Sequence, residues 1–198
     1  MTTGKPISSD ALDQLFHDAR SQNGYVDKPV TDDELKQLYD VLKMGPTSMN
    51  CLPARFIFAR SAEQKEKVAA CSAPPNQGKI RNAPVVAIIG MDMDFVDELP
   101  RLFPHADMRG LFAGNDQLVH DTAFRNSSLQ GAYLIMAARA LGLDCGPMSG
   151  FNPQAMDDAF WSDTNVKTNF ISTIGHGDPS KIFPRLPRYD FHEVCKLL

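Results

Sequence analysis

The chain is organised around Gln117–Phe151, which reads QLVHDTAFRNSSLQGAYLIMAARALGLDCGPMSGF. Between Leu129 and Leu141 apolar and small residues predominate on every side of a helix, with one charge at Arg139. A helix that is apolar all round is normally buried on all sides, and this run is shorter than the roughly 20 residues that cross a bilayer. The pattern predicts a central core helix, and Gly142 suits the left-handed position just past its end.

The segment after this helix is the first candidate site. Cys145–Gly150 contains two glycines and a proline, which predicts a turn whose backbone amides a flat ligand can approach closely. The alternative is an ordinary loop that follows a helix end.

Length and composition narrow the class of protein. The 198 residues fit one domain, 1–198, with a core of its own. A hydrophobic content of 43% and a net charge of -4 are typical of a globular protein and disfavour nucleic-acid binding. The N-terminus has no long apolar run behind its lysine, so we expect a cytoplasmic protein that does not enter a membrane. The four cysteines form no C-x-x-C pair, and the histidines form no metal-binding pattern, so we expect reduced thiols and no metal site.

Local signals predict most of the helices and strands. Ser9 or Asp10 is expected to cap a first helix that ends near Arg20, and the capping box Thr31–Glu34 predicts a second helix. The further predicted elements are a strand at 55–59, a helix capped at Ser61, a loop at Pro74–Lys79, a strand at 84–90 buried on both faces, a helix starting at Asn152-Pro153 and a strand at 170–174.

Two segments lack clear periodicity. Residues 94–114 are interpreted as an excursion that forms a lid over the site, with a plain surface insertion as the alternative. Residues from Gly175 onward, about 176–198, form a Gly/Pro-rich tail that carries Lys181, Arg185 and Arg188.

Common nucleotide and hydrolase motifs are missing. The sequence has no G-x-G-x-x-G after a strand, no Walker motif and no G-x-S-x-G elbow. What remains is a set of polar loops that mix cations with amides or hydroxyls and together suit an anionic, hydrogen-bonding ligand. Each alone is more often a solvated turn. They are Arg20–Asn23, Pro46–Asn50, Asn76–Lys79 and the tail with Lys181 and Arg185.

The order of these loops resembles the FMN-dependent nitroreductase family over nearly the whole chain. The similarity is strongest to its malonic semialdehyde reductase-like branch, the RutE/HadB type, through KMGPTSMNCLPAR, LPRLFPHADMR, FRNSSLQGAYLI and ALGLDCGPMSGF. The resemblance implies an α+β fold, in which helices flank a central, mostly antiparallel sheet, and a domain-entwined homodimer. It also implies FMN as cofactor and NADH or NADPH as cosubstrate.

The family pattern implies specific flavin contacts. Arg20 and Arg185 would bind the phosphate, Lys79 would lie at the pyrimidine edge, and the Gly150 amide would face N5 of the ring. The loop Pro46–Pro53 would come from the partner subunit. Asn23, Leu52 and Ser149 depart from the family pattern. The full set of expected contacts is Arg20, Ser21, Asn23, Pro46, Thr47, Ser48, Asn50, Asn76, Lys79, Pro147, Met148, Ser149, Gly150, Lys181 and Arg185.

The resemblance also implies a reaction. We expect NAD(P)H-dependent reduction of malonic semialdehyde to 3-hydroxypropionate, a step of pyrimidine catabolism, with no side chain required as a catalytic acid or base. Arg109, before Arg101, is the candidate partner of the substrate carboxylate, and a surface ion pair of Arg109 with Asp107 is the alternative. The rival functions are a broad nitroaromatic or quinone reductase and a flavin-binding protein without turnover.

Overall fold

A four-stranded antiparallel sheet forms the centre of the computed structural model, which describes residues 4–198. The strand order is β1-β2-β4-β3. Helices connect β1 to β2 and β3 to β4 along the chain, which is the α+β arrangement that the family resemblance implies. The strands are β1 (Ala54–Ala59), β2 (Val85–Asp92), β3 (Asp144–Met148) and β4 (Val166–Gly175).

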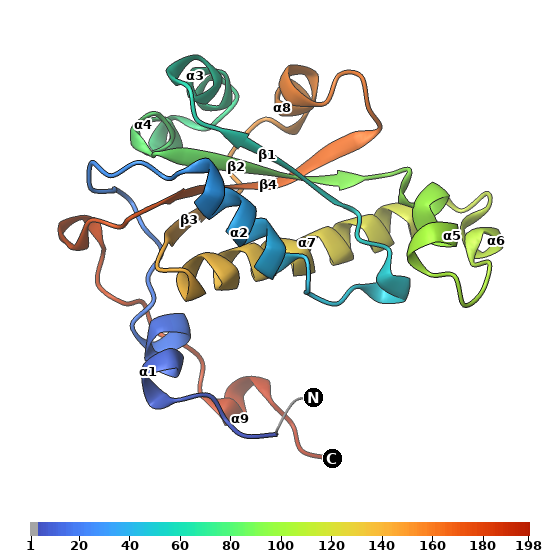
Figure 1. Cartoon of the computed structure of the whole chain (residues 1–198), viewed down its shortest axis with the longest axis horizontal. Helices are drawn as coiled ribbons and strands as arrows, with labels where there is room; N and C mark the ends of the chain where they lie inside the picture. Colours follow the sequence, from blue (N-terminus) through green and yellow to red (C-terminus); the bar gives the residue numbers. More distant parts are fainter. Residues whose placement is uncertain (1–3) are drawn as a thin grey trace.

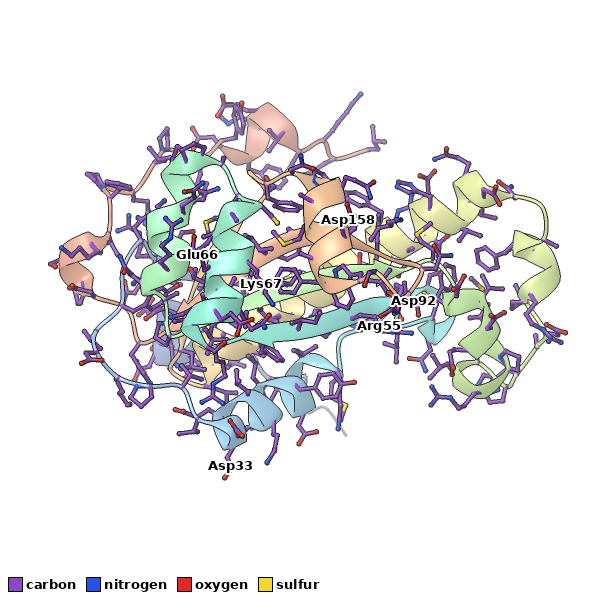
Figure 2. All side chains as sticks on the ribbon, turned by 90° about the horizontal axis from the view of Figure 1, so that it is seen from above. Asp33, Arg55, Glu66, Lys67, Asp92 and Asp158 are labelled. Carbon is purple, nitrogen blue, oxygen red and sulfur yellow. The ribbon has the colours of Figure 1, made fainter. Side chains whose placement is uncertain are left out.

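Helices cover both faces of this sheet (Figure 1). The first face packs against α2 (Asp32–Leu42) and α7 (Asp116–Ala140). The second packs against α3 (Ala62–Ala70), α4 (Pro74–Asn82) and α8 (Pro153–Phe160). Figure 2 looks onto this second face, and it shows Arg55 beside Asp92, which form an ion pair between β1 and β2.

The position of strand β2 between two layers of helices explains why its sequence is apolar without interruption. Val85, Ala87 and Ile89 pack toward α2 and α7, while Val86 and Ile88 pack toward α3, α4 and α8. Because successive side chains of a strand point to opposite faces, a strand covered on both sides must be apolar at every position. The predicted burial on both faces is confirmed.

Several predicted helix starts are also confirmed. Thr31 and Glu34 form the reciprocal capping box, Ser61 accepts from the Gln64 amide, and Asn152 caps α8 ahead of its first-turn proline. The first helix differs slightly. Ser8, rather than Ser9 or Asp10, caps α1 (Ser9–Leu12), which continues as the π-helical turn η1 (Asp13–His17).

The loop predicted at Pro74–Lys79 is wrong, because these residues begin helix α4. Its two prolines occupy the first helical positions, where a missing N–H costs no hydrogen bond. Ile80 is fully buried and anchors the helix against the sheet. Proline and Gly78 suggested a loop, but burial of Ile80 outweighs the modest helix penalty of one glycine.

The central helix α7 is present and longer than predicted, and Gly142 follows it with a φ of +75°. Its predicted burial on all sides is wrong for this chain. Phe124, Leu129 and Tyr133 are 50%, 45% and 41% exposed, whereas polar Gln130 is buried. The buried side accepts Gln130 because its side-chain oxygen receives a hydrogen bond from Ala54 N at 2.8 Å.

The turn predicted at Cys145–Gly150 is also corrected, because residues through Met148 belong to strand β3. Pro147 is compatible with a strand here since β3 lies at the edge of the sheet. Only the residues between Met148 and α8 form the connecting loop.

Residues 94–114 are not featureless. They form the short helices η3 (Phe95–Glu98), α5 (Leu99–Leu102) and α6 (Arg109–Phe112). These helices pack around a small separate core that is completed by Cys51, Met91 and Ala123. Phe95 and Phe112 meet edge to face with ring centroids 5.2 Å apart, beside buried Leu99. The tail contains η4 (Pro179–Lys181) and α9 (Phe191–Val194), and it exposes Leu186 and Tyr189.

Candidate functional site

A cationic pocket lies where the N-terminal segment meets the C-terminal tail. Its volume is about 210 Å³, and none of the described residues that line it is acidic. In Figure 1 the two segments extend together beyond the C-terminal end of α7. We call it the arginine pocket; its lining residues are Ala19, Arg20, Ser21, Asn23, Arg139, Phe183, Pro184, Arg185, Leu186 and Arg188.

Hydrogen bonds from arginine side chains to backbone oxygens connect the N-terminal segment with the tail at the arginine pocket. Each of the two segments supplies both a donor and an acceptor. Arg20 donates to the backbone oxygen of Phe183 in the tail. Arg185 donates to the backbone oxygens of His17 and Ala19, the latter at 3.3 Å. Asn23 adds a long contact to the Lys181 oxygen at 3.4 Å. The sequence places these segments more than 150 residues apart, and the fold makes them one site.

The Arg20 loop is fixed along the edge of strand β3. Ser21 forms a parallel bridge with Cys145, and the Gln22 amide donates to the Cys145 oxygen at 2.9 Å. A Cβ on Gly146 would lie 2.5 Å from the Gln22 oxygen and from Thr173 Oγ1. Glycine is therefore required at 146 for this close approach.

A second group of expected contacts assembles where α4 meets the loop after β3. Asn76 Nδ2 donates to the Gly150 oxygen at 3.2 Å, and Ala73 N donates to the same oxygen at 2.9 Å. Ser149 and Gly150 are exposed residues, and their N–H groups donate no hydrogen bond within residues 4–198. Lys79, one turn after Asn76, forms no ion pair with any described residue.

The loop Pro46–Pro53 lies elsewhere in this chain. Ser48 N donates to Asn126 Oδ1 at 2.8 Å, and Asn50 Nδ2 donates to the Leu102 oxygen at 2.9 Å. Asn126 and Arg139 both lie on α7, and their 13-residue separation corresponds to about 20 Å along the helix. One chain thus does not bring this loop to the arginine pocket.

The same loop contains left-handed residues other than glycine. Met49, Asn50 and Leu52 have φ values of 51°, 48° and 39°. Such conformations cost free energy, and they persist where the surrounding structure fixes the backbone, often at functional sites. Here the Leu52 amide is held by Thr47 Oγ1 at 3.2 Å, which helps fix the loop.

Arg109 forms a two-pronged ion pair with Asp107. Its Nε and Nη2 lie 3.0 and 2.7 Å from the two carboxylate oxygens, and this contact lowers the pKa of Asp107 to about 2. Both side chains are more than half exposed. Arg109 also lines a cavity of about 740 Å³ between residues 93–113 and the first turns of α7. Arg101 pairs with Glu98. The substrate role of Arg109 stays a prediction.

Two remaining tail cations take different positions. The stem of Lys181 packs on Gly24, where an added Cβ would lie 2.8 Å from Lys181 Cγ. Arg188 lines the arginine pocket, and its Nη1 donates to the oxygens of Leu186 and Pro187, each at 3.0 Å.

Arg139 is a cation of the arginine pocket that the sequence did not assign to the site. The sequence offered one signal, a single charge in an otherwise apolar stretch of the central helix. The structure places it in the last turn of α7, on the wall of the arginine pocket.

No group of three or more His, Cys, Asp or Glu side chains within residues 4–198 is placed to hold a metal ion. Cys51, Cys71, Cys145 and Cys195 form no disulfide. None of the described helices is long and apolar enough to cross a membrane.

Solved structures with the same fold include proteins provisionally named nitroreductases. A protein from Exiguobacterium sibiricum, provisionally named a nitroreductase and solved in complex with FMN, superimposes with a TM-score of 0.84, covering 98% of this chain and 99% of that one at 20% identity. The Bacillus subtilis protein YdfN, also provisionally named a nitroreductase, gives a TM-score of 0.84, with 96% and 100% coverage at 19% identity. The fold is therefore that of the nitroreductases.

The sequence comparison places the chain in a family. The pattern of the nitroreductase family matches residues 17–176. A Ralstonia pickettii protein provisionally named NADH dehydrogenase/NAD(P)H nitroreductase HadB is 55% identical, with 94% of this chain and 97% of that one aligned. A Polynucleobacter asymbioticus protein with the same provisional enzyme name is 53% identical, with 97% and 98% aligned. This chain belongs to the nitroreductase family.

Proposed function

We propose that this protein is an FMN-dependent NAD(P)H oxidoreductase that reduces malonic semialdehyde to 3-hydroxypropionate. The observation that carries the flavin part is the arginine pocket, a cluster of cations without acidic lining that is built by both ends of the chain. The names of the relatives, NADH dehydrogenase/NAD(P)H nitroreductase, support NAD(P)H as the reductant.

The pocket fits the phosphate end of FMN. Each guanidinium presents a planar fork of N–H donors that matches phosphate oxygens. Arg20 and Arg185 each spend one nitrogen on a backbone oxygen, which orients the fork and leaves further N–H groups for an anion. Ser21 also lines this pocket.

The α4 and β3 region fits the ring end of FMN. The unpaired N–H groups of Ser149 and Gly150 are donors for ring heteroatoms, and the unpaired Lys79 ammonium lies one helical turn beyond Asn76. Bound FMN would carry the hydride from NAD(P)H to the acceptor. The polypeptide contributes binding, orientation and electrostatic tuning, which is all that a flavin enzyme requires of it.

A homodimer would complete the site. The loop Pro46–Pro53 lies about 20 Å from the arginine pocket along α7, too far to contact a phosphate bound there. The partner subunit is proposed to supply the loop's expected flavin contacts. Exposed apolar side chains of α7, Phe124, Leu129 and Tyr133, offer a surface for that partner.

The proposed substrate is an aldehyde that carries a carboxylate. In the overall reaction the aldehyde carbon gains a hydride, its oxygen gains a proton, and NAD(P)H is oxidised. Arg109 is the proposed partner of the carboxylate, because it lines a large cavity and offers a fork that already holds a carboxylate, that of Asp107.

The proposal is tested in two stages. Purified protein should show the absorption spectrum of a bound flavin, and denaturation should release that flavin as FMN. The protein should also oxidise NAD(P)H steadily when an acceptor is present. A binding protein without turnover would show the spectrum alone. Malonic semialdehyde is then compared with nitrofurazone and an uncharged quinone, and a preference for the aldehyde is expected. Faster reduction of nitrofurazone or quinone would favour the broad reductase.

A further inference from the structure

The arginines of this chain are distributed unevenly. The sequence contains ten, and all lie in the described residues. Of the five that pair with no carboxylate there, four line the arginine pocket, and the fifth, Arg125, lies in another cavity. Gathering unpaired like charges works against folding, so this concentration points to a bound anion. The paired five are Arg55, Arg60, Arg81, Arg101 and Arg109.

Arg139 differs from the other three arginines of the pocket because it lies on a helix. It stands in the last turn of α7, where the helix dipole favours a cation. Its Nη1 donates to the Leu15 oxygen at 2.9 Å, and Gln14 Nε2 donates back to the Arg139 oxygen at 2.7 Å. Its Nε and Nη2 donate to no other described residue, so three of the five N–H groups of the guanidinium remain available.

We infer that Arg139 is a third phosphate-binding cation of the flavin site, acting together with Arg20 and Arg185. The inference rests on the proposed function, and it adds a residue that the family pattern did not supply. A phosphate monoester carries between one and two negative charges and three acceptor oxygens, so three arginine forks can each address one oxygen.

Arg139 has a second property that Arg20 and Arg185 lack. Those two come from the N-terminal segment and the tail, and they bond to each other's backbones. Arg139 comes from a 25-residue helix that packs under the sheet. A charge held on such an element keeps its position before the ligand arrives, so Arg139 is the fixed cation onto which the other two segments close. Arg188 is a weaker candidate, because its Nη1 bonds to its own tail.

Riboflavin provides the test, because it has the ring and the ribityl chain of FMN but no phosphate. Dissociation constants of flavin-free protein for FMN and for riboflavin are measured by quenching of flavin fluorescence. The ratio of riboflavin to FMN constants isolates the contribution of the phosphate. Arg139→Ala should lower this ratio about 10-fold or more, while the riboflavin constant changes by less than about 3-fold.

Three further variants separate charge from structure. Arg101→Ala removes a cation from an exposed pair at the far end of the molecule and should leave the ratio unchanged. Gln14→Ala removes the bond to the Arg139 oxygen without changing charge and should alter the ratio by less than about 2-fold. Arg139→Lys keeps one charge but no fork, so it should lie between wild type and Arg139→Ala; it also serves if the alanine variant does not fold.

Each outcome decides between the alternatives. A ratio that stays at the wild-type value in Arg139→Ala, or a Gln14→Ala loss as large as that of Arg139→Ala, would overturn the inference, because Arg139 would then act only in holding the N-terminal segment. Equal weakening of FMN and riboflavin by Arg139→Ala would overturn it as well. Wild-type protein that binds neither flavin would instead refute the proposed function itself.

Discussion

Asn76 and Gly150 lie 74 positions apart in the sequence, yet Asn76 Nδ2 donates a hydrogen bond to the Gly150 oxygen at 3.2 Å. This bond connects α4 to the loop after β3. Because residues three apart lie on one side of a helix, Lys79 follows Asn76 toward the same region. The helical state of α4 therefore decides which of its side chains can reach the proposed flavin ring.

Replacing Gly78 tests that helical state. An added Cβ there meets nothing within 4 Å, and the glycine has no left-handed φ. Gly78→Ala should therefore raise the free energy of unfolding by about 0.4 to 1 kcal/mol, because alanine loses less backbone entropy in a helix. Gly131→Ala is the opposite control, since its Cβ would lie 2.4 Å from the Phe170 ring and should destabilise by about 1 to 3 kcal/mol. Urea unfolding measures both, and a destabilised Gly78→Ala would contradict the helix.

Removal of Arg185 tests the phosphate assignment. Arg185→Ala, and separately Arg20→Ala, should weaken FMN binding by roughly 1 to 3 kcal/mol, the usual contribution of a hydrogen bond to a charged group. Each substitution also removes a bond that joins the N-terminal segment to the tail. Fluorescence titration of flavin-free protein gives the dissociation constants. Wild-type affinity in both variants would rule out this assignment.

The subunit composition can be measured directly. We expect an obligate dimer of about 44 kDa, twice the 21.9 kDa chain, because Leu129 and Tyr133 of α7 and Tyr189 of the tail are exposed apolar side chains. Sedimentation equilibrium at micromolar concentration distinguishes the states. A monomer that retains its flavin at that concentration would show that one chain is sufficient.

Substitution of Arg109 tests the proposed carboxylate partner. Arg109→Ala should lower kcat/KM for malonic semialdehyde about 10-fold or more, equivalent to about 1.4 kcal/mol, and leave reduction of an uncharged quinone nearly unchanged. The pKa of Asp107 lies at about 2, below its ordinary value, so the ion pair is present at neutral pH and is lost only as pH falls toward 2. Equal losses on both acceptors would indicate damage to folding or to the flavin site.

Thiol reactivity should follow burial. Burial raises the pKa of Cys145 to about 12 and that of Cys51 to about 11, despite a hydrogen bond from Ser172 and Thr47 respectively that lowers each. Since the thiolate is the reactive form, neither should react with a disulfide reagent at pH 8, whereas exposed Cys195 should react at once. A Cys195→Ser variant identifies the fast thiol. Rapid modification of Cys145 in the folded protein would contradict its burial.

The sequence by itself determined the features that depend on a few neighbouring residues. The Thr31–Glu34 capping box, the Asn152-Pro153 helix start and the end of α7 at Gly142 act through bonds within one or two turns. The apolar run of β2 predicted a strand covered on both faces, because apolar side chains that point to both faces of a sheet need a packed layer on each face. The family resemblance was readable for the same reason, since its motifs are local.

Tertiary structure decided what depends on distant partners. Burial of Ile80 turned the Pro74–Lys79 segment into a helix, and pairing with β4 made Cys145–Met148 a strand. The exposed face of α7 was not visible in a pattern that looked apolar all round. Arg139 entered the arginine pocket only because the end of α7 meets the Leu15 backbone. The Arg139–Leu15 contact joins residues 124 positions apart, and β3 pairs with β4 across an intervening helix. No local preference encodes such contacts, because their free energy arises only when the packed layers bring both partners together.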